Sequence, residues 1–233
     1  MLTAAIMQPY FVPYLGYFQL IAAVDLFIVY DNIKYTKKGW INRNRILQRD
    51  HAIPFSLPLK RGSDVLDIRD RELAADFSGT KLLNQVTGAY RRAPYYAQTL
   101  PLVERIVQSD ERNLFRFLEH SIRLTCEHLG ILTTITPSSE IAIDHGLTGQ
   151  SKVLALCQAV EASTYINAIG GIDLYSKDEF RDRGLALNFI RSTPFTYPQF
   201  GSGHVPWLSI VDVLMFNSVS ATRERARTGY ELI

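Results

Sequence analysis

The sequence of 233 residues contains little cysteine and no long apolar run. Its two cysteines, Cys126 and Cys157, have apolar helical neighbours and no Cys-x-x-Cys spacing, so we interpret both as buried thiols. Such sparse use of cysteine suits the reducing cytosol. The apolar residues 1–8 meet Pro9 without a preceding basic segment, and they fall short of the ~18 apolar residues that a membrane span needs. We therefore expect a cytoplasmic protein without a signal peptide or a membrane anchor.

A strong excess of either charge is also missing, because 25 lysines and arginines face 23 acidic residues and leave a formal net charge of +2. Sequence-independent binding of nucleic acid needs a clustered basic face, which so small a net charge does not favour. No spacing of histidine, cysteine or carboxylate residues predicts a metal site. The sequence therefore predicts neither a nucleic-acid partner nor a bound metal.

Short apolar runs alternate with helical patterns at the start of the chain. Residues 3–7 and 26–30 each indicate a short buried strand, and residues 18–24 between them repeat apolar side chains at helical spacing. Residues 79–130 are mainly helical in pattern. This alternation predicts an α/β fold with a parallel, Rossmann-like sheet. We treat residues 1–233 as a single α/β domain that carries a helical lobe at roughly 79–130.

The loop that follows the first predicted strand is the strongest local signal of a ligand site. Its candidate ligand-binding residues are Gln8, Pro9, Tyr10, Tyr14, Gly16 and Tyr17. Prolines fix backbone angles, Gly16 allows close approach of a backbone or a ligand, and the free N–H groups of a helix start favour an anion. A rigid turn lined by aromatic side chains, without a ligand, is the alternative interpretation.

The turn Tyr14-Leu15-Gly16-Tyr17 resembles, in its spacing, the nucleotide-binding turn of the nucleotidyltransferase and adenylate-forming superfamily. In that superfamily a His-x-Gly-His element opens the first helix and binds triphosphate, so the likeness implies a nucleotidyltransferase-like parallel sheet. Tyrosine has a reference pKa of about 10 and cannot be the readily protonated donor that histidine is near neutral pH. The likeness therefore concerns fold and site location, without the ATP chemistry.

Residues 34–49 concentrate cations and amides around a tryptophan. The candidates for ligand contact in this segment are Lys38, Trp40, Asn42, Arg43 and Arg45. Arginine forks pair with phosphate oxygens, and Trp40 offers a face for a base or a sugar. A nucleotide-linked substrate would fit such a cluster, and a solvated basic loop is the alternative.

Polar residues and glycines also follow other predicted strands. Asp31 ends the second strand, and Asn167 ends a later one, which Gly170 and Gly171 break. The carboxyl ends of parallel strands meet at one edge of a sheet, where ligands bind. We therefore predict that these residues converge with the first loop and that Tyr14, Gly16 and Asp31 share one pocket.

Candidates for acid–base chemistry are few. Of the five histidines, His145 and His204 lie in predicted loops, which carry catalytic groups on a rigid scaffold. Asp31 could orient a substrate amine or simply cap a turn together with Asn32. We take His145, Asp31 and Tyr17 as the catalytic candidates, with His204 as a second loop histidine.

Several of these segments together resemble the WbqC-like family, a group of proteins from bacterial O-antigen and related glycan clusters. The resemblance rests on residues 6–21, Asp25, Tyr30-Asp31 and residues 39–46, with weaker echoes at residues 165–167, Gly170-Gly171, Leu174-Tyr175, Phe180, Tyr197-Pro198-Gln199 and residues 208–212. It spans nearly the whole chain, and its N-terminal part is long and specific. The family resemblance implies modification of a sugar precursor by an acyl or aminoacyl group.

Our leading hypothesis is a transferase that acylates or aminoacylates the amine of a nucleotide-activated amino sugar during bacterial polysaccharide precursor synthesis. No cofactor is assigned, and the candidate donors are an acyl-carrier thioester and ATP. The candidate partners are the nucleotide-linked sugar, an acyl carrier protein and a second copy of the chain. The alternatives are an ATP-dependent, adenylate-forming amide ligase and a non-catalytic protein that binds nucleotide sugars or acts as a scaffold.

Overall fold

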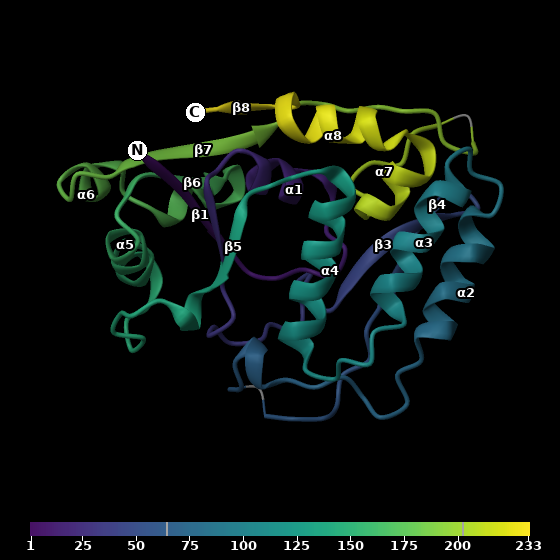
Figure 1. Ribbon diagram of the computed structural model, residues 1–233, viewed down its shortest axis with the longest axis horizontal. Coiled ribbons are helices and arrows are strands. Elements are labelled where there is room, and N and C mark those ends of the chain that lie inside the picture. Colours follow the sequence, from purple (N-terminus) through teal and green to yellow (C-terminus); the bar gives the residue numbers. More distant parts are fainter. Residues whose placement is uncertain (64, 202) are drawn as a thin grey trace.

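A computed structural model describes residues 1–63, 65–201 and 203–233. The strands are β1 (Leu2–Met7), β2 (Leu26–Val29), β3 (Arg43–Gln48), β4 (His51–Ser56), β5 (Thr134–Pro137), β6 (Ala162–Ala168), β7 (Ala186–Ser192) and β8 (Tyr230–Leu232). The α-helices are α1 (Leu15–Ala22), α2 (Gly79–Tyr90), α3 (Tyr96–Val107), α4 (Leu114–Leu129), α5 (Gly149–Ala159), α6 (Lys177–Arg181), α7 (Ile210–Phe216) and α8 (Val219–Thr228). Figure 1 shows their arrangement.

The central sheet has six strands in the order β5-β2-β1-β6-β7-β8. All neighbouring pairs are parallel except the last, in which β8 runs antiparallel to β7. The α/β fold with a parallel sheet is thus confirmed. The chain leaves β1 through α1 toward β2, and it later returns to the opposite side of β1 as β6. The strand order therefore reverses between β1 and β6, and such reversal points open ligand crevices at the carboxyl ends of the strands.

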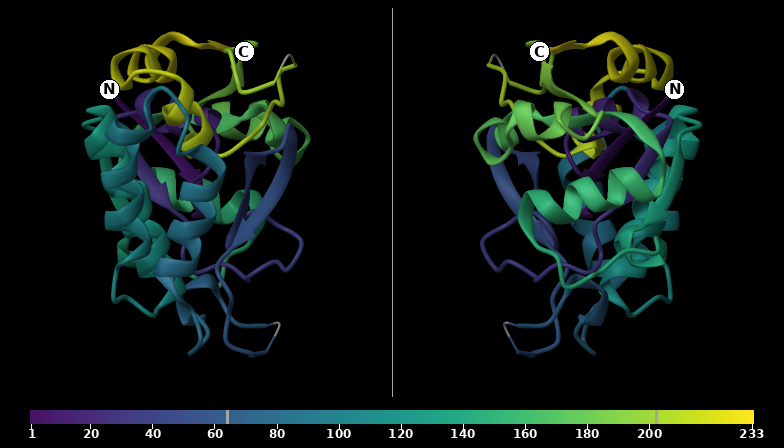
Figure 2. Two further views of the ribbon diagram at one scale, coloured as in Figure 1. Left: turned by 90° about the vertical axis from the view of Figure 1, so that its right-hand side faces the viewer. Right: turned by 90° about the vertical axis from the view of Figure 1, so that its left-hand side faces the viewer.

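Helices cover both faces of the sheet. On one face, α5 and α6 pack with strand residues such as Ile6, Ile28 and Tyr165 in a small apolar cluster. The right-hand view of Figure 2 looks onto α5 in front of the sheet. On the other face, a larger apolar cluster joins α1, α4 and α7. Burial on both faces explains why β1 and β2 are continuous apolar runs rather than alternating ones.

The predicted helical segment forms the antiparallel helices α2, α3 and α4, which extend from the right of Figure 1 to its centre. α4 begins after Asn113, whose side chain caps the backbone N–H of Arg116, and it ends at Gly130 with a φ of 62°. Both signals are the usual ones for helix ends. Beside this lobe, β3 and β4 form a separate two-stranded hairpin. Pro54 is tolerated in β4 because this strand pairs with β3 alone, so only one side of its backbone takes part in hydrogen bonds between strands.

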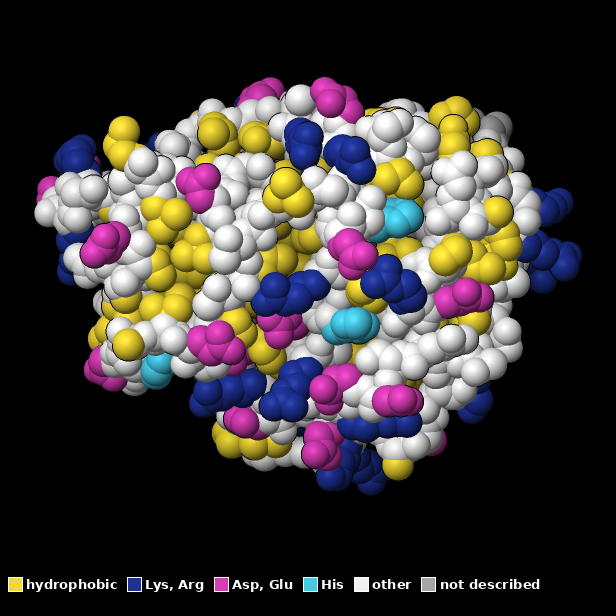
Figure 3. All heavy atoms as spheres, in the orientation of Figure 1, with side chains coloured by type: hydrophobic (Ala, Val, Ile, Leu, Met, Phe, Trp, Pro, Cys, Tyr) yellow, Lys and Arg dark blue, Asp and Glu magenta, His cyan; other side chains and the backbone are white. Residues whose placement is uncertain are grey.

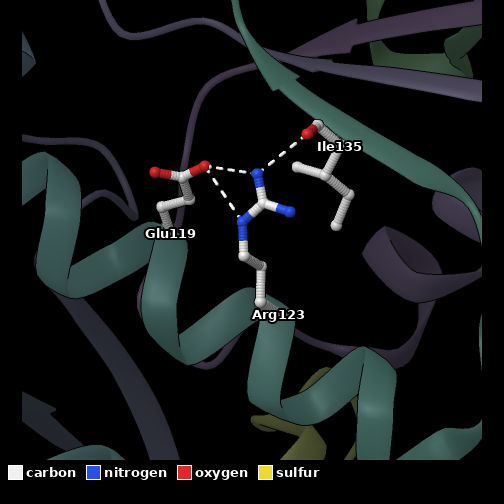
Figure 4. A network of polar contacts seen from close by, with 3 residues as sticks. All are labelled: Glu119, Arg123 and Ile135. Carbon is white, nitrogen blue, oxygen red and sulfur yellow. Dashed lines mark hydrogen bonds and ion pairs between the residues drawn. The ribbon is translucent and has the colours of Figure 1, made fainter.

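The edge strand β5 is tied to α4 by an arginine. The Arg123 guanidinium donates to the carbonyl oxygen of Ile135 at 2.8 Å and pairs with Glu119 at 2.7 Å, as Figure 4 shows. The edge carbonyl is thereby satisfied from within the molecule, which limits pairing of this edge with another chain.

The surface over α4 mixes charges of both signs. In Figure 3, basic and acidic side chains interleave in the lower centre of this face, while hydrophobic side chains are more frequent on the left. This mixing agrees with the small net charge. Among the described residues, no helix combines the length and the apolar character needed to cross a membrane.

Candidate functional site

Two neighbouring cavities, each of about 290 Å³, lie at the carboxyl edge of the sheet. The His204 cavity is lined by the start of α1 and the connection after β7: Tyr14, Leu15, Gly16, Gln19, Ser192, Thr193, Pro194, Phe195, Thr196, Tyr197, His204, Pro206, Trp207, Leu208 and Val213. The Arg45 cavity is lined by Tyr10, Pro13, Tyr14, Trp40, Asn44, Arg45 and Trp207. Together they form the candidate site.

Tyr14 and Trp207 line both cavities and form the partition between them. Their rings meet edge to face, with centroids 5.7 Å apart. Gly16 makes this position of Tyr14 possible, because a Cβ on Gly16 would lie 2.4 Å from atoms of the Tyr14 ring. The close approach expected at Gly16 is therefore that of a neighbouring tyrosine side chain.

Two residues beside the cavities have backbone angles that cost free energy. Val12 has a φ of 36° and Trp207 a φ of 59°, in the left-handed region that side chains other than glycine rarely adopt. Asn44 and Ser209 both donate to the Val12 carbonyl, at 2.9 and 2.6 Å. Arg45 donates to the Trp207 carbonyl at 3.0 Å. Backbone strain that is held in place by several hydrogen bonds in this way is typical of functional sites.

Arg45 is the one arginine or lysine among the residues described as lining the two cavities. Its guanidinium carbon lies 5.1 Å from the centre of the Trp40 ring, and Nη2 donates to Trp207. Its Nε is buried without a hydrogen-bond partner among the described residues. A buried donor of this kind calls for an acceptor, and an anion is the acceptor that a guanidinium pairs with best.

The other residues predicted from the basic segment shape the loop that carries Trp40. Arg43 donates to the carbonyl oxygens of Gly39 and Lys37, at 2.9 and 2.8 Å. Asn42 accepts from a tyrosine hydroxyl and donates to a carbonyl just after β4, both at 2.8 Å. Lys38 is exposed. Of this segment's candidates, Trp40 and Arg45 are those that reach a described cavity.

Asp31 lies just after β2 and His145 lies in the loop between β5 and α5, and both are outside the described lining of the two cavities. Asp31 is buried and accepts from the Ser138 hydroxyl at 2.8 Å and from the Ser139 N–H and hydroxyl at 2.9 and 2.6 Å. His145 Nδ1 lies 2.8 Å from the Asn32 amide nitrogen. β5 lies beside β2 in the sheet, so the residues that follow β5 are the ones that donate hydrogen bonds to the Asp31 carboxylate.

A buried lysine accompanies this second cluster. Lys152 of α5 donates to the Asn32 carbonyl at 3.2 Å, and its ammonium lies 5.2 Å from the centre of the Tyr30 ring. Burial lowers the pKa of Lys152, and the nearby Asp67 and Asp31 carboxylates oppose that shift. Burial also raises the pKa of Tyr30 to about 12.

The remaining predicted residues separate into core and turn positions. Tyr17 is buried, and its hydroxyl donates to the Gln8 carbonyl at 2.9 Å. Burial raises the pKa of Tyr17 well above its ordinary value. Pro9 is buried beside this contact. Asn167 is buried within β6 and Gly170 is exposed just after it, and the described lining of the cavities includes neither.

Beside the site lies a buried carboxylate to which the sequence alone gave no role. Asp212 of α7 is fully buried and accepts from the hydroxyls of Tyr90 and Tyr197, each at 2.7 Å, and from the Gln199 amide at 2.8 Å. Burial raises the pKa of Asp212, and the three donors oppose that shift. The sequence signals for this network were the two short segments of family resemblance at Tyr197-Pro198-Gln199 and residues 208–212. The fold brings these two segments together into one hydrogen-bond network.

The described residues include no group of three or more histidine, cysteine, aspartate or glutamate side chains placed to hold a metal ion. The group placed to bind the phosphate of a nucleotide, or another anion, is the Arg45 guanidinium beside Trp40.

The fold and the cavities define an α/β protein with its candidate ligand site at the carboxyl edge of a parallel sheet. Residues 8–224 match the model of the WbqC-like protein family, and the chain belongs to that family. The chain is also 27% identical over 216 residues to the "Uncharacterized protein Rv1507c" of Mycobacterium tuberculosis (strain ATCC 25618 / H37Rv), across 91% of this chain and 92% of that protein. No solved structure matches the chain. The range matched by the family includes every residue that lines the two cavities.

Proposed function

We propose that this protein is a transferase that places an acyl or aminoacyl group on the amine of a nucleotide-linked amino sugar. The observation that carries the proposal is Arg45, a guanidinium with an unpartnered buried Nε among the described residues, stacked on Trp40 at the wall of a cavity. A phosphate supplies the acceptor for such a donor, and a nucleobase or sugar supplies the partner for the aromatic wall.

The size of the cavities suggests how one substrate is divided between them. A volume of 290 Å³ corresponds to about ten water molecules at roughly 30 Å³ each, which is enough for a sugar ring or a small acyl group. The diphosphate belongs beside Arg45 and Trp40, and the amino sugar reaches past Tyr14 and Trp207 into the His204 cavity. This arrangement uses both cavities and their shared partition.

His204 is the group suited to take the proton, because it lines the cavity that receives the amino sugar and His145 does not. With an acyl thioester as the donor, the amine nitrogen attacks the carbonyl carbon, the C–N bond forms and the C–S bond breaks. The imidazole accepts the proton that the nitrogen loses and returns it to the departing thiolate. The products are an amide and a free thiol.

An adenylate-forming ligase is the second candidate, favoured by the first turn of α1. That turn borders the His204 cavity, and no described side chain caps it. The Tyr17 N–H donates to the Tyr14 carbonyl at 3.1 Å, so the N–H groups of Leu15 and Gly16 are the ones available to a phosphate. The Tyr14 ring packs against Gly16 in the same turn and brings no positive charge to a departing pyrophosphate. For that reason we rank ATP cleavage below transfer from a thioester.

Tryptophan fluorescence tests the binding step directly, since Trp40 and Trp207 are the only tryptophans and both line the Arg45 cavity. Titration with UDP- and dTDP-linked amino sugars should change the emission. Arg45→Ala should weaken binding by about 1.5–3 kcal/mol, the range for a hydrogen bond to a charged group. Arg43→Ala should weaken it less, because Arg43 already pairs with its own loop, and the exposed Arg116→Ala serves as the control. Unchanged affinity in Arg45→Ala would remove this cavity from nucleotide recognition.

Mass spectrometry of the sugar tests the transfer step. The protein is incubated with the amino-sugar nucleotide and either an acyl-carrier thioester or ATP with a free acid. Amide formation from the thioester, lost in His204→Gln, is the expected result. Amide formation that requires ATP and releases pyrophosphate would promote the ligase, whereas tight binding without product would leave a nucleotide-sugar-binding protein.

A further inference from the structure

We infer that Asp212 is a positioning residue that, through Tyr197 and Gln199, holds His204 in the protonation form that a general base needs. The inference rests on the proposed function, in which His204 takes the amine proton. Asp212 itself lies beneath the cavity wall in α7 and does not reach the cavity. Its effect on the reaction is therefore indirect.

Asp212 is the fixed point of the network. It is fully buried in α7, and Ser209 caps the start of that helix by accepting from the Val211 N–H. One carboxylate oxygen accepts from Tyr90, whose hydroxyl oxygen accepts in turn from the Leu47 N–H at 2.8 Å. This side of the carboxylate is thereby anchored to α2 and β3. The other oxygen is directed to the segment that carries His204.

Gln199 transmits the position of Asp212 to the backbone beside His204. Its amide nitrogen donates to Asp212 at 2.8 Å and to the Val205 carbonyl at 3.2 Å. Its amide oxygen accepts from the Val205 N–H at 2.8 Å. One side chain thus bonds both backbone groups of the residue that follows His204, in the manner of a neighbouring strand. These contacts hold the backbone immediately after His204 in place.

Tyr197 fixes the imidazole ring itself. Its hydroxyl donates to Asp212 at 2.7 Å, and its ring meets the His204 ring edge to face with centroids 4.8 Å apart. His204 Nδ1 lies 3.3 Å from the Tyr197 carbonyl oxygen. A carbonyl oxygen can only accept, so this contact requires a proton on Nδ1 and leaves Nε2 with a free electron pair. That tautomer is the one in which Nε2 acts as the base.

A purely structural network would give a different result from a positioning network. If these contacts only stabilised the core, removing one would lower the free energy of unfolding and leave the tautomer of His204 unchanged. If they position the imidazole, the loss of the Gln199 contacts frees the ring and both tautomers become populated. The tautomer therefore separates the two roles.

The experiment compares Gln199→Met with Gln158→Met, a matched change at an exposed position of α5. The ¹⁵N resonances of the His204 ring are recorded in the ligand-free protein, in its neutral form. The wild type and Gln158→Met should show the Nδ1–H tautomer, and Gln199→Met should show both. A wild-type ring protonated on Nε2, or an unchanged ring in Gln199→Met, would overturn the inference.

Tyr197→Phe is the second variant, because it removes only the hydroxyl that contacts Asp212 and keeps the ring and the carbonyl beside His204. It should also mix the tautomers, and it covers the case in which Gln199→Met does not fold. With the amino-sugar substrate, both variants should lower kcat roughly ten- to hundredfold while KM changes less than about twofold, since misplacing a base affects the chemical step more than binding.

The two proposals can fail separately. The tautomer is measured without any substrate, so a mixed tautomer in the variants together with no transfer by the wild type would disprove the transferase and leave the positioning of His204 standing. Transfer by the wild type with an unchanged tautomer in both variants would support the transferase and disprove the positioning of His204.

Discussion

Tyr14 and Tyr17 lie one helical turn apart in the chain but in opposite environments. Tyr14 lines both cavities, whereas Tyr17 is buried and donates its hydroxyl to the Gln8 carbonyl. Tyr17→Phe should therefore lower the free energy of unfolding by about 1–3 kcal/mol, the cost of an unsatisfied buried acceptor, and leave ligand affinity unchanged. Urea unfolding and fluorescence titration measure the two quantities. Loss of transfer at unchanged stability would instead place Tyr17 in the reaction.

The two cysteines provide a test of burial. Burial raises the pKa of Cys126 and of Cys157 to about 12, so at pH 8 the folded protein carries very little thiolate. A thiol reagent at pH 8 should label the native protein slowly and the urea-unfolded protein fast. Two readily labelled cysteines in the native protein would contradict the packing of α4 and α5.

The same shifts have a definite sign in stability. The folded pKa lies above the unfolded value, near 9, so this contribution to stability is fully present below pH 9 and is lost as the pH rises toward 12. The free energy of unfolding should therefore fall in this range, and less so in Cys126→Ala.

At the residue scale, sequence patterns identified the kind of side chain in the site but not always its partner. Arg43 and Arg45 look equivalent in the sequence, yet one binds its own loop and the other the Trp207 carbonyl, 162 positions away. His145 and His204 both lie in loops, and only the fold shows which one borders a cavity. Contacts with residues that are distant in the sequence determine which arginine and which histidine reach a cavity. A local sequence pattern carries no information about such contacts.

At the scale of elements, two glycines in helices allow a matched comparison. A Cβ on Gly16 of α1 would collide with the Tyr14 ring, whereas a Cβ on Gly88 of α2 would meet nothing within 4 Å. Gly88→Ala should stabilise the protein by roughly 0.5–1 kcal/mol through helix propensity. Gly16→Ala should give no such gain and should weaken ligand binding, because it displaces the partition between the cavities.

Thermal unfolding and fluorescence titration of the two variants provide the measurement. Equal stabilisation by both alanines, with normal binding, would show that Tyr14 can move without consequence for the site.

Elements with strong periodicity were predictable and others were not. Residues 3–7 and 26–30 are β1 and β2 to within one residue, and the segment at 79–130 is helical as predicted. The helix α8 has no such signal, because its buried residues are only Thr222 and Ala226 and its other side chains are mostly polar or charged. Its position depends on contacts with α1 and α4 that a local pattern does not contain.

At the scale of the whole molecule, the candidate site depends on segments from opposite ends of the chain. The Ser209 hydroxyl donates to the Val12 carbonyl, and the Ile210 N–H donates to the Pro13 carbonyl at 2.9 Å. The rule that ligands bind beyond the carboxyl ends of parallel strands points to the edge of the sheet at which these candidate cavities lie. Sequence reasoning could not show that the connection after β7 forms the opposite wall, since nothing in its composition identifies its partner.

The helical lobe shares its core with the site, which has a consequence for unfolding. Phe117 of α4 is fully buried, with its ring 6.2 Å from Phe11 of the loop between β1 and α1 and 5.6 Å from Phe77. Phe11 in turn lies 5.1 Å from Phe55 of the hairpin. One apolar cluster thus joins lobe, loop and hairpin. We therefore expect residues 1–233 to unfold as one cooperative unit.

Two signals that report on different regions test this expectation. Far-UV circular dichroism follows the helices of the whole chain, whereas tryptophan fluorescence follows only the site, where Trp40 and Trp207 lie. Their urea transitions should coincide. Phe117→Ala should lower the free energy of unfolding by about 3–5 kcal/mol and shift both transitions together, although the mutation lies in the lobe and neither tryptophan does. A variant in which the helical signal is lost at lower urea than the fluorescence signal would mean that residues 79–130 form a separate unit, and that the site keeps its shape without them.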